Sequence, residues 1–240
     1  MIAERGLEGC NSVFPEMPQR GHIVRFGSFP FIDLSDIRPI EWIVLDVRTG
    51  ESGRTEVLLL SRYGLYCKKF HHRFCRITWE ISQLRRWLNG TFVRKAFSEE
   101  EQKLIMVSHL QNEDSRQFGT SGGNNTDDRV FCLSLAEFYR YCTRKVEWLC
   151  RPTPYSRKQG NGAYADPDGY GCWWLRSPGG NPNYIVIVDS DGTVNDLGRY
   201  MLNAVNRYVL LYGFCCSPKR EKYLVCPFKK NDLNYNLPVL

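Results

Sequence analysis

The stretch that decides the fold is Cys172-Trp-Trp-Leu-Arg-Ser-Pro-Gly-Gly180, and an Asn- and Tyr-rich segment follows it as far as Tyr208. Neighbouring side chains in a strand point to opposite faces, so Trp173 and Trp174 would face away from each other. Either both rings pack in the core, or one anchors the core while the other flanks a surface. A rigid aromatic block followed by loops of ligand-contacting residue types predicts a scaffold with a binding surface. We therefore expect Trp173, Trp174 and Arg176 to support that surface.

Short strands are predicted on both sides of this block. Upstream they fall at residues 23–26, 41–46, 56–61 and 130–133, and downstream at 184–188 and 209–214. Asp189-Ser-Asp-Gly192 predicts a hairpin turn, because Gly192 is free to take a positive φ. Residues 151–171 are rich in Pro, Gly and Tyr and predict a long irregular connection.

Helices are predicted between the two groups of strands. Residues 80–88 place three apolar side chains, Ile81 among them, on one face, and Asn89-Gly90 is predicted to end that helix. Ser98-Glu-Glu-Glu101 and Ser134-Leu-Ala-Glu137 are capping boxes, in which the two side chains satisfy each other's free backbone donors. Strands, helices and strands again in one chain predict an α+β fold with short antiparallel strands, a few helices and much irregular loop.

Length and charge bound the organisation of the chain. The 240 residues, 42% of them hydrophobic, suffice for one packed core, which we place at residues 21–216 as a single domain. Residues 1–20 predict a flexible N-terminal arm and residues 217–240 a basic C-terminal tail. That tail supplies half of the formal net charge of +6. The body is then only mildly basic, which argues against nucleic acid as its partner.

Cysteine usage and the start of the chain bear on its location. Ten cysteines are spread along the sequence, and a chain of this length does not need disulfides to fold. The first ten residues lack the apolar region of a signal peptide, and no apolar run approaches the ~18 residues of a membrane span. Reduced thiols in the cytoplasm are therefore the default expectation, with export by a route that the sequence does not reveal as the alternative.

Two groups of side chains have the chemistry of metal ligands. The zinc-ligand types are Cys67, His71, His72 and Cys75. Structural zinc sites usually draw two ligand pairs from separated knuckles, so an ordinary loop is favoured. The calcium-ligand types are Asp189, Asp191, Asn195 and Asp196. A hairpin turn is favoured there, because Gly192 follows too soon for the twelve-residue calcium loop. We expect no catalytic residue, metal or cofactor.

Seven motifs occur in order along the chain. They are Phe26-Gly-Ser-Phe-Pro30, Pro39-Ile-Glu-Trp-Ile-Val-Leu45, Leu84-Arg-Arg-Trp-Leu-Asn-Gly-Thr-Phe92, Ala96-Phe-Ser-Glu-Glu-Glu101, Val130-Phe-Cys-Leu-Ser134, Trp173-Trp-Leu-Arg-Ser-Pro-Gly179 and Val188-Asp-Ser-Asp-Gly192. Together, over about residues 20–212, they resemble a bacterial domain family of unknown function that adopts a C-type-lectin-like fold. The resemblance implies that fold for this chain.

Some members of such lectin-fold families are variable proteins of diversity-generating retroelements, in which an error-prone reverse transcriptase rewrites adenines near the 3′ end of the gene. The resemblance implies a fixed frame, consisting of Val188, Asp191, Gly192, Val194, Gly198 and Val209. It also implies a displayed set, consisting of Asn181, Asn183, Tyr184, Ile187, Asp189, Asn195, Asp196, Leu197, Arg199, Tyr200, Leu202, Asn203, Asn206, Arg207 and Tyr208. The composition of this set favours binding by itself, because Tyr gives rigid contact area and Asn adaptable hydrogen bonds. A loop region with no partner is the alternative.

We therefore expect a non-enzymatic protein that displays residues 180–208 to a protein or cell-surface ligand. Two other functions stay open. Formylglycine-generating oxidases resemble this fold and use cysteines for catalysis, which would nominate Cys215 or Cys216, although packed small residues are favoured at that pair. A nucleic-acid or assembly adaptor would act through the basic tail, residues 217–240.

Overall fold

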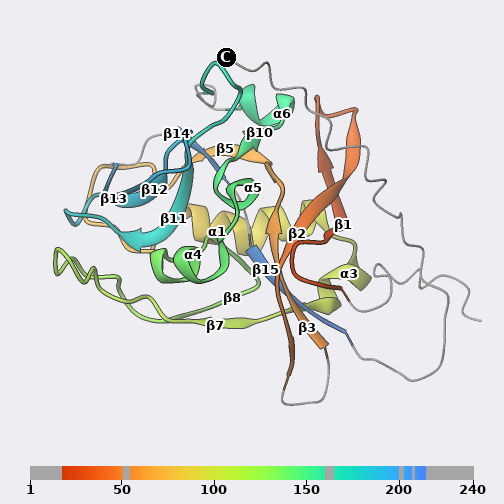
Figure 1. The fold of residues 1–240 in the computed structure, drawn as a ribbon, viewed down its shortest axis with the longest axis horizontal. Coiled ribbons are helices and arrows are strands. Elements are labelled where there is room, and N and C mark those ends of the chain that lie inside the picture. Colours follow the sequence, from red (N-terminus) through yellow and green to blue (C-terminus); the bar gives the residue numbers. More distant parts are fainter. Residues whose placement is uncertain (1–17, 51–54, 160–164, 200–202, 207–208, 215–240) are drawn as a thin grey trace, which may run out of the picture.

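The computed structural model describes residues 18–50, 55–159, 165–199, 203–206 and 209–214. These residues form two larger sheets, two short strand pairs and several short helices, which confirms the predicted α+β class. Figure 1 shows β1–β3 on one side of the molecule and β11–β13 on the other. Most of the predicted arm and the whole predicted tail lie outside the described residues.

The first sheet has six strands. In the order of pairing β1-β2-β3-β15-β6, with β9 also beside β15, they are β1 (Ile23–Pro30), β2 (Ile37–Thr49), β3 (Thr55–Ser61), β15 (Val209–Phe214), β6 (Ile105–Met106) and β9 (Val130–Phe131). The pairs β1–β2 and β2–β3 are antiparallel, as expected for consecutive strands joined by short connections. The last described strand, β15, inserts between β3 and β6 and pairs with β3 from Val209 opposite Leu60 to Phe214 opposite Thr55.

The second sheet has five strands and carries the aromatic block. In the order of pairing they are β13 (Val194–Arg199), β12 (Ile185–Val188), β11 (Trp173–Pro178), β14 (Asn203–Asn206) and β5 (Tyr66–Lys69). The β11–β14 pair is parallel and the others are antiparallel. The two short pairs are β4 (Tyr63–Gly64) with β10 (Arg151–Pro152), and β7 (Ser108–Leu110) with β8 (Thr126–Asp128).

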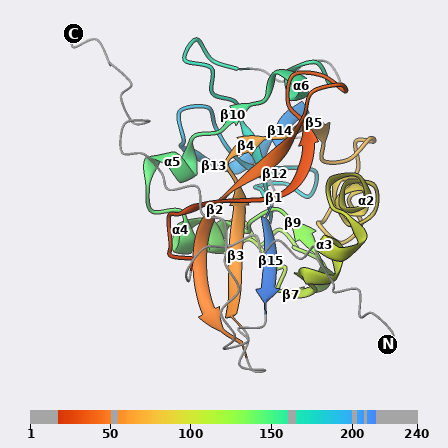
Figure 2. The ribbon, with the colours of Figure 1, turned by 90° about the vertical axis from the view of Figure 1, so that its right-hand side faces the viewer.

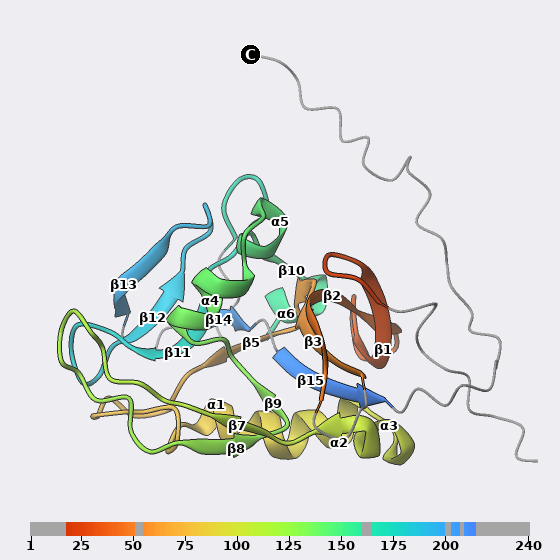
Figure 3. The same ribbon diagram turned by 60° about the horizontal axis from the view of Figure 1, so that its bottom comes forward.

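Helices cover both sides of the first sheet. They are α1 (Gln83–Trp87), a π-helical turn (Leu88–Phe92), α2 (Val93–Ala96), α3 (Glu99–Leu104), α4 (Leu135–Tyr141), α5 (Lys145–Trp148) and α6 (Pro154–Arg157). Figures 2 and 3 place α4 and α5 on one side of β2, β3 and β15, and α2 and α3 on the other. Both predicted capping boxes are confirmed, because the Ser98 and Ser134 hydroxyls accept bonds from the N–H groups of Glu101 and Glu137.

The predicted end of the first helix is wrong. Asn89 and Gly90 lie inside the π-helical turn, which joins α1 to α2. The Asn89 side chain donates to the carbonyl oxygens of Arg85 and Val130 and accepts from the Arg129 N–H, so it bonds the helix to β9 instead of capping it. The predicted apolar face is also narrower than expected, because Ile81 is 44% exposed.

One hydrophobic cluster joins the two sheets and the helices, which favours a single domain. Four tryptophans, Trp42, Trp79, Trp173 and Trp174, are fully buried in it. Their ring N–H groups each have an acceptor, as buried polar groups require. At the N-terminal side, Pro18 is buried and the Arg20 guanidinium donates to the Tyr141 carbonyl, so residues 18–20 pack on the body.

Candidate functional site

The aromatic block forms β11 at the centre of the second sheet. Trp173 packs on Phe138 of α4 with ring centroids 5.8 Å apart, whereas Trp174 packs on Phe70 at 5.6 Å on the other face. Because both rings are fully buried, the interpretation that both are core residues is confirmed, and neither flanks a surface. The block therefore supports its surroundings from both faces of the sheet.

The Pro-Gly-Gly end of the block is held against β13. The Gly179 N–H donates to the Tyr184 carbonyl, and the Gly180 N–H donates to the Leu197 carbonyl, both at 2.8 Å. A Cβ atom at Gly179 would lie 2.4 Å from the Leu197 oxygen, so only glycine fits this close approach. The loop after the block is thus pinned to the edge strand of the sheet.

The predicted hairpin turn is confirmed. The Gly192 N–H donates to the Asp189 carbonyl at 2.9 Å, and Gly192 has a φ of 88°. The Asp191 carboxylate accepts bonds from the backbone N–H and the hydroxyl of Thr193. These hydrogen bonds lower the pKa of Asp191 below its ordinary value. The side chain is therefore engaged within its own turn, which is how a hairpin turn uses an aspartate.

Exposure varies within both the frame and the displayed set along β12 and β13. Of the frame residues, Val188 and Gly198 are buried, Gly192 and Val194 are half-buried and Asp191 is exposed. The exposed members of the displayed set are Asn181, Leu197 and Arg199, and the half-buried members are Asn183, Tyr184, Asp189, Asn195 and Asp196. Ile187 is only 2% exposed, because it points from β12 into the core, so its assignment to the displayed set is wrong.

Six displayed positions lie farther along the chain. Tyr200, Leu202, Arg207 and Tyr208 lie outside the described residues, as do Cys215 and Cys216. The backbone of Asn203 and Asn206 lies in β14, where it pairs with Lys69 and Tyr66 of β5. In the second sheet, β13 is therefore an edge strand whereas β14 lies between β11 and β5.

Arg176 forms a set of bonds that uses all five of its N–H donors. The side chain is only 2% exposed and forms an ion pair with Glu137 of α4. Its other donors reach the Cys132 carbonyl at 2.9 Å, the Asn112 side chain at 3.2 Å and the Gln111 carbonyl at 3.3 Å. Since each donor has an acceptor, Arg176 fixes the positions of three segments.

A cavity of about 530 Å³ opens above this ion pair, and we call it the α4 cavity. Residues 111–118, α4 and the end of β11 line it, and Asp196 of the displayed set lies in its wall. Two aromatic residues of the lining are exposed, Phe118 at 37% and Tyr139 at 63%. Leu197, next to Asp196, is 54% exposed. The cavity and the β12–β13 hairpin are therefore adjacent.

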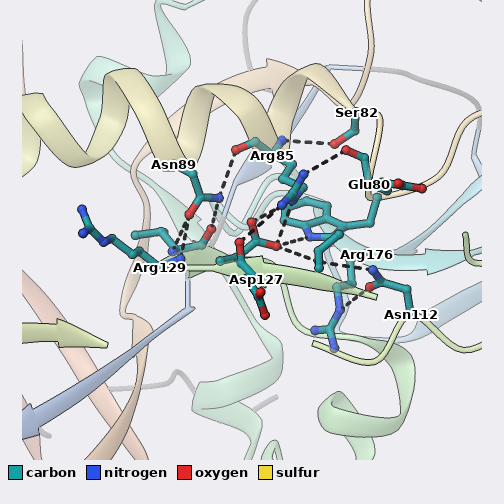
Figure 4. Close-up of polar contacts among 12 residues, drawn as sticks. Glu80, Ser82, Arg85, Asn89, Asn112, Asp127, Arg129 and Arg176 are labelled. Atoms are coloured by element: carbon teal, nitrogen blue, oxygen red, sulfur yellow. Dashed lines mark hydrogen bonds and ion pairs between the residues drawn. The ribbon is translucent and has the colours of Figure 1, made fainter. Parts of the chain in front are cut away.

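A buried polar network below the cavity was missed by the sequence analysis (Figure 4). The Asp128 carboxylate accepts bonds from Arg85 at 2.8 Å, from the Trp79 ring N–H at 2.9 Å and from the Thr126 hydroxyl at 2.9 Å. Asn112 then bonds both Thr126 and Arg176. One feature of the sequence could have indicated this network. Arg85 and Asn89 are four residues apart on a predicted helix, so both polar side chains lie on the same face of it.

The candidate metal groups show no assembled centre. Cys67 is buried in β5 whereas Cys75 is exposed, and no group of three or more possible metal ligands occurs among the described residues. In the second group, the Asn195 side chain accepts a bond from the Gly198 N–H at 3.0 Å, and Asp189 lies 3.5 Å from Arg199. These oxygens are used within the hairpin.

Three of the described thiols, Cys67, Cys132 and Cys172, are poor nucleophiles. Burial raises the pKa of Cys67 to about 11 and that of Cys132 to about 12. At Cys172, burial together with the Asp189 carboxylate raises the pKa to about 11. A thiol must lose its proton to attack, so these three stay protonated at neutral pH.

No helix in the described ranges is long and apolar enough to cross a membrane. Neither a curated protein nor a solved structure matches the chain. Residues 54–209 match the model of DUF6273, a domain of unknown function. The match runs from β3 to the start of β15 and contains the aromatic block, the Arg176 ion pair and the α4 cavity. Because it covers more than half of the chain, the protein belongs to the DUF6273 family.

Proposed function

We propose that this protein is a non-enzymatic ligand-binding protein whose binding face consists of the β12–β13 hairpin, residues 180–184 and the α4 cavity. The α4 cavity is the observation that carries the proposal. It has a volume of about 530 Å³, which is within the usual range of ligand sites. Exposed apolar side chains around such a hollow are typical of interaction sites. A protein or cell-surface ligand is the partner class that we propose.

The charged floor of the cavity suits binding better than catalysis. Arg176 and Glu137 neutralise each other, and the Ser134 N–H also donates to Glu137 at 2.9 Å. A pair engaged in this way shapes the cavity without offering a free base or nucleophile. Asp196 is different, because its carboxylate has no hydrogen bond or ion pair within the part of the chain that the structure describes. It is the group we expect to select a ligand with a donor or a cation.

The finer part of the proposal is a C-type-lectin-like fold in a variable protein of a diversity-generating retroelement. The seven ordered motifs support it. So does the exposure of Leu197 and Arg199 on β13, two members of the displayed set. Substitutions at exposed positions of a strand change a surface without disturbing the core. That is the property that a diversified protein needs.

The flanking DNA tests the retroelement. We expect a near-copy of the codons for residues 180–210 close to the gene, differing from it only at adenines and accompanied by a reverse transcriptase gene. Sequencing the locus decides the point. A locus with neither the copy nor the transcriptase gene would remove the retroelement and leave the ligand-binding proposal to its own test.

The binding face is tested by selecting peptides from a phage-displayed random library against the full chain and measuring the affinity of a synthetic selected peptide by calorimetry. We expect Tyr139→Ser and Leu197→Ser each to weaken binding by at least about tenfold, because apolar side chains buried at the centre of an interface carry most of its affinity. Both side chains are more than half exposed in the free protein, so the melting temperature should change little.

Leu34→Ser is the matched control. Leu34 is 74% exposed in the turn between β1 and β2, outside the α4 cavity, so this variant should bind like the wild type. Peptides that bind all three variants equally would show that the binding face lies elsewhere. If no peptide is selected but the wild type binds a glycan array, the ligand class changes to saccharide. The proposed site is kept in that case if Tyr139→Ser and Leu197→Ser lose the glycan binding.

A further inference from the structure

The formal net charge of +6 is unevenly distributed along the chain. Residues 62–98 hold nine lysines and arginines against a single acidic residue, Glu80. Glu80 bonds the Asn124 side chain at 3.1 Å. The remaining residues hold more acidic than basic side chains, so the net charge of the whole chain does not reveal the positive charge of this segment.

Six of these cations lie on β5, on α1, on α2 or in the connection between β5 and α1, and we call them the basic surface. They are Lys68, Lys69, Arg73, Arg76, Arg86 and Arg94. The connection is tied to α1 by the Leu84 N–H, which donates to the Phe70 carbonyl at 3.1 Å. It is also tied to the loop after β11 by the Ile77 N–H, which donates to the Pro182 carbonyl at 2.8 Å. Figure 1 shows it passing on the same side of the molecule as β12 and β13.

Further contacts bring the cations of different elements together. The Lys68 ammonium lies 5.6 Å from the centre of the Trp87 ring on α1. Arg73 and Arg86 both lie close enough to His71 to lower its pKa, together with His72 and the larger effect of burial. The Arg94 guanidinium reaches back to within 4 Å of the Cβ position of Gly90, towards the turn of the helix that carries Arg86. These contacts bring Lys68 of β5 and Arg73 of the connection to α1, the helix that carries Arg86.

Among the residues that the structure describes, no carboxylate neutralises a cation of the basic surface. Arg62 and Arg85, from the same segment, form ion pairs with Glu41 and Asp128. In contrast, the described residues contain no ion pair for any of the six cations, and five of the six are exposed, Lys68 being half-buried. Like charges held close together repel one another, and a bound polyanion removes that cost.

An exposed aromatic ring lies among these cations. Phe74 is 63% exposed and stands between Arg73 and Arg76 in the sequence, with the exposed His72 beside it. A ring between two cations matches one base of a single strand with a phosphate on either side of it. A duplex hides its base faces from such a ring. Membrane binding is less favoured, because stable docking on a membrane needs a larger apolar area than the one strongly exposed ring of this surface.

We propose that the basic surface binds single-stranded nucleic acid, with Arg73 and Arg76 contacting phosphates and Phe74 stacking on a base. This surface is separate from the α4 cavity, because no residue of the basic surface lines that cavity. Nucleic-acid binding would then be a second interaction of residues 21–216, in addition to ligand binding at the α4 cavity. It is distinct from any contact made by residues 217–240.

The test is fluorescence anisotropy of the full chain, under reducing conditions, with labelled oligo(dT) and oligo(U) of about fifteen nucleotides. With roughly four to six phosphate contacts, the affinity should fall on the order of 50- to 300-fold between about 50 and about 200 mM salt. Arg73→Gln combined with Arg76→Gln should reduce the slope of log K against log salt by about 1.4. Phe74→Ala should weaken binding roughly tenfold and Phe74→Tyr should retain it.

Two control proteins locate the site. Arg25→Gln combined with Arg38→Gln removes the same charge from β1 and β2 and should bind normally. The second control replaces the cations of the tail with Gln, namely Lys219, Arg220, Lys222, Lys229 and Lys230. In this background, the Arg73 and Arg76 changes should still reduce the slope of log K against log salt. Binding lost only with the tail changes would overturn the proposal. So would duplex binding as tight as single-strand binding, or binding to vesicles of phosphatidylcholine and phosphatidylserine with none to either oligonucleotide.

Discussion

Replacing Arg176 with Met is expected to lower the free energy of unfolding by about 3 kcal/mol and to abolish binding at the α4 cavity. Breaking a buried ion pair from one side costs about 3–5 kcal/mol, because the remaining charge is left without a partner. The Glu137 side chain is 27% exposed, so water recovers part of that loss and the lower end applies. Urea unfolding followed by tryptophan fluorescence, with peptide binding in parallel, measures both effects.

Arg116→Met is the control for this experiment. Arg116 also lines the cavity, but its side chain is 87% exposed and its ion pair with Glu113 lies at the surface. Exposed pairs contribute at most about 1 kcal/mol, so the stability should barely change. Equal unfolding midpoints for the Arg176 and Arg116 variants would show that the five bonds of Arg176 do not hold the floor of the cavity.

Replacing Asp128 with Asn is expected to cost about 3–5 kcal/mol of stability, which is the range for a buried charge pair broken at one partner. The Asp128 side chain is fully buried and accepts bonds from Arg85, Trp79 and Thr126. Asparagine has the same shape as aspartate, but its NH2 group would face at least one of these three hydrogen-bond donors and could not accept from it. The Trp79 ring N–H is also fully buried and has no route to water.

The neighbouring residue supplies the control. Asp127 precedes Asp128 in β8, but its side chain is 68% exposed and pairs with His109 at the surface. Asp127→Asn should therefore change the free energy of unfolding by less than about 1 kcal/mol. Similar losses for the two variants in urea titrations would mean that Asp128 is not the centre of the network.

The local elements could be predicted because their determinants lie close together in the chain. The capping boxes at Ser98 and Ser134 and the turn at Gly192 depend on residues within four positions of one another. Alternation along the strand also predicted that Trp173 and Trp174 occupy opposite faces. The end of the first helix could not be predicted, because the partners of Asn89 are Arg129 and Val130, about forty residues away.

The composition of residues 172–208 by itself determined an aromatic scaffold followed by loops suited to contact. Only the tertiary structure decided which of those residues are available, because burial depends on the sheet that packs on each strand. It buried Ile187, placed Asp196 in the wall of a cavity built by α4, and gave Arg176 partners 39 to 65 residues away. It also brought Lys68 of β5 and Arg73 of the following connection to the helix that carries Arg86. Packing and pairing across such distances depend on topology, which local sequence patterns do not encode.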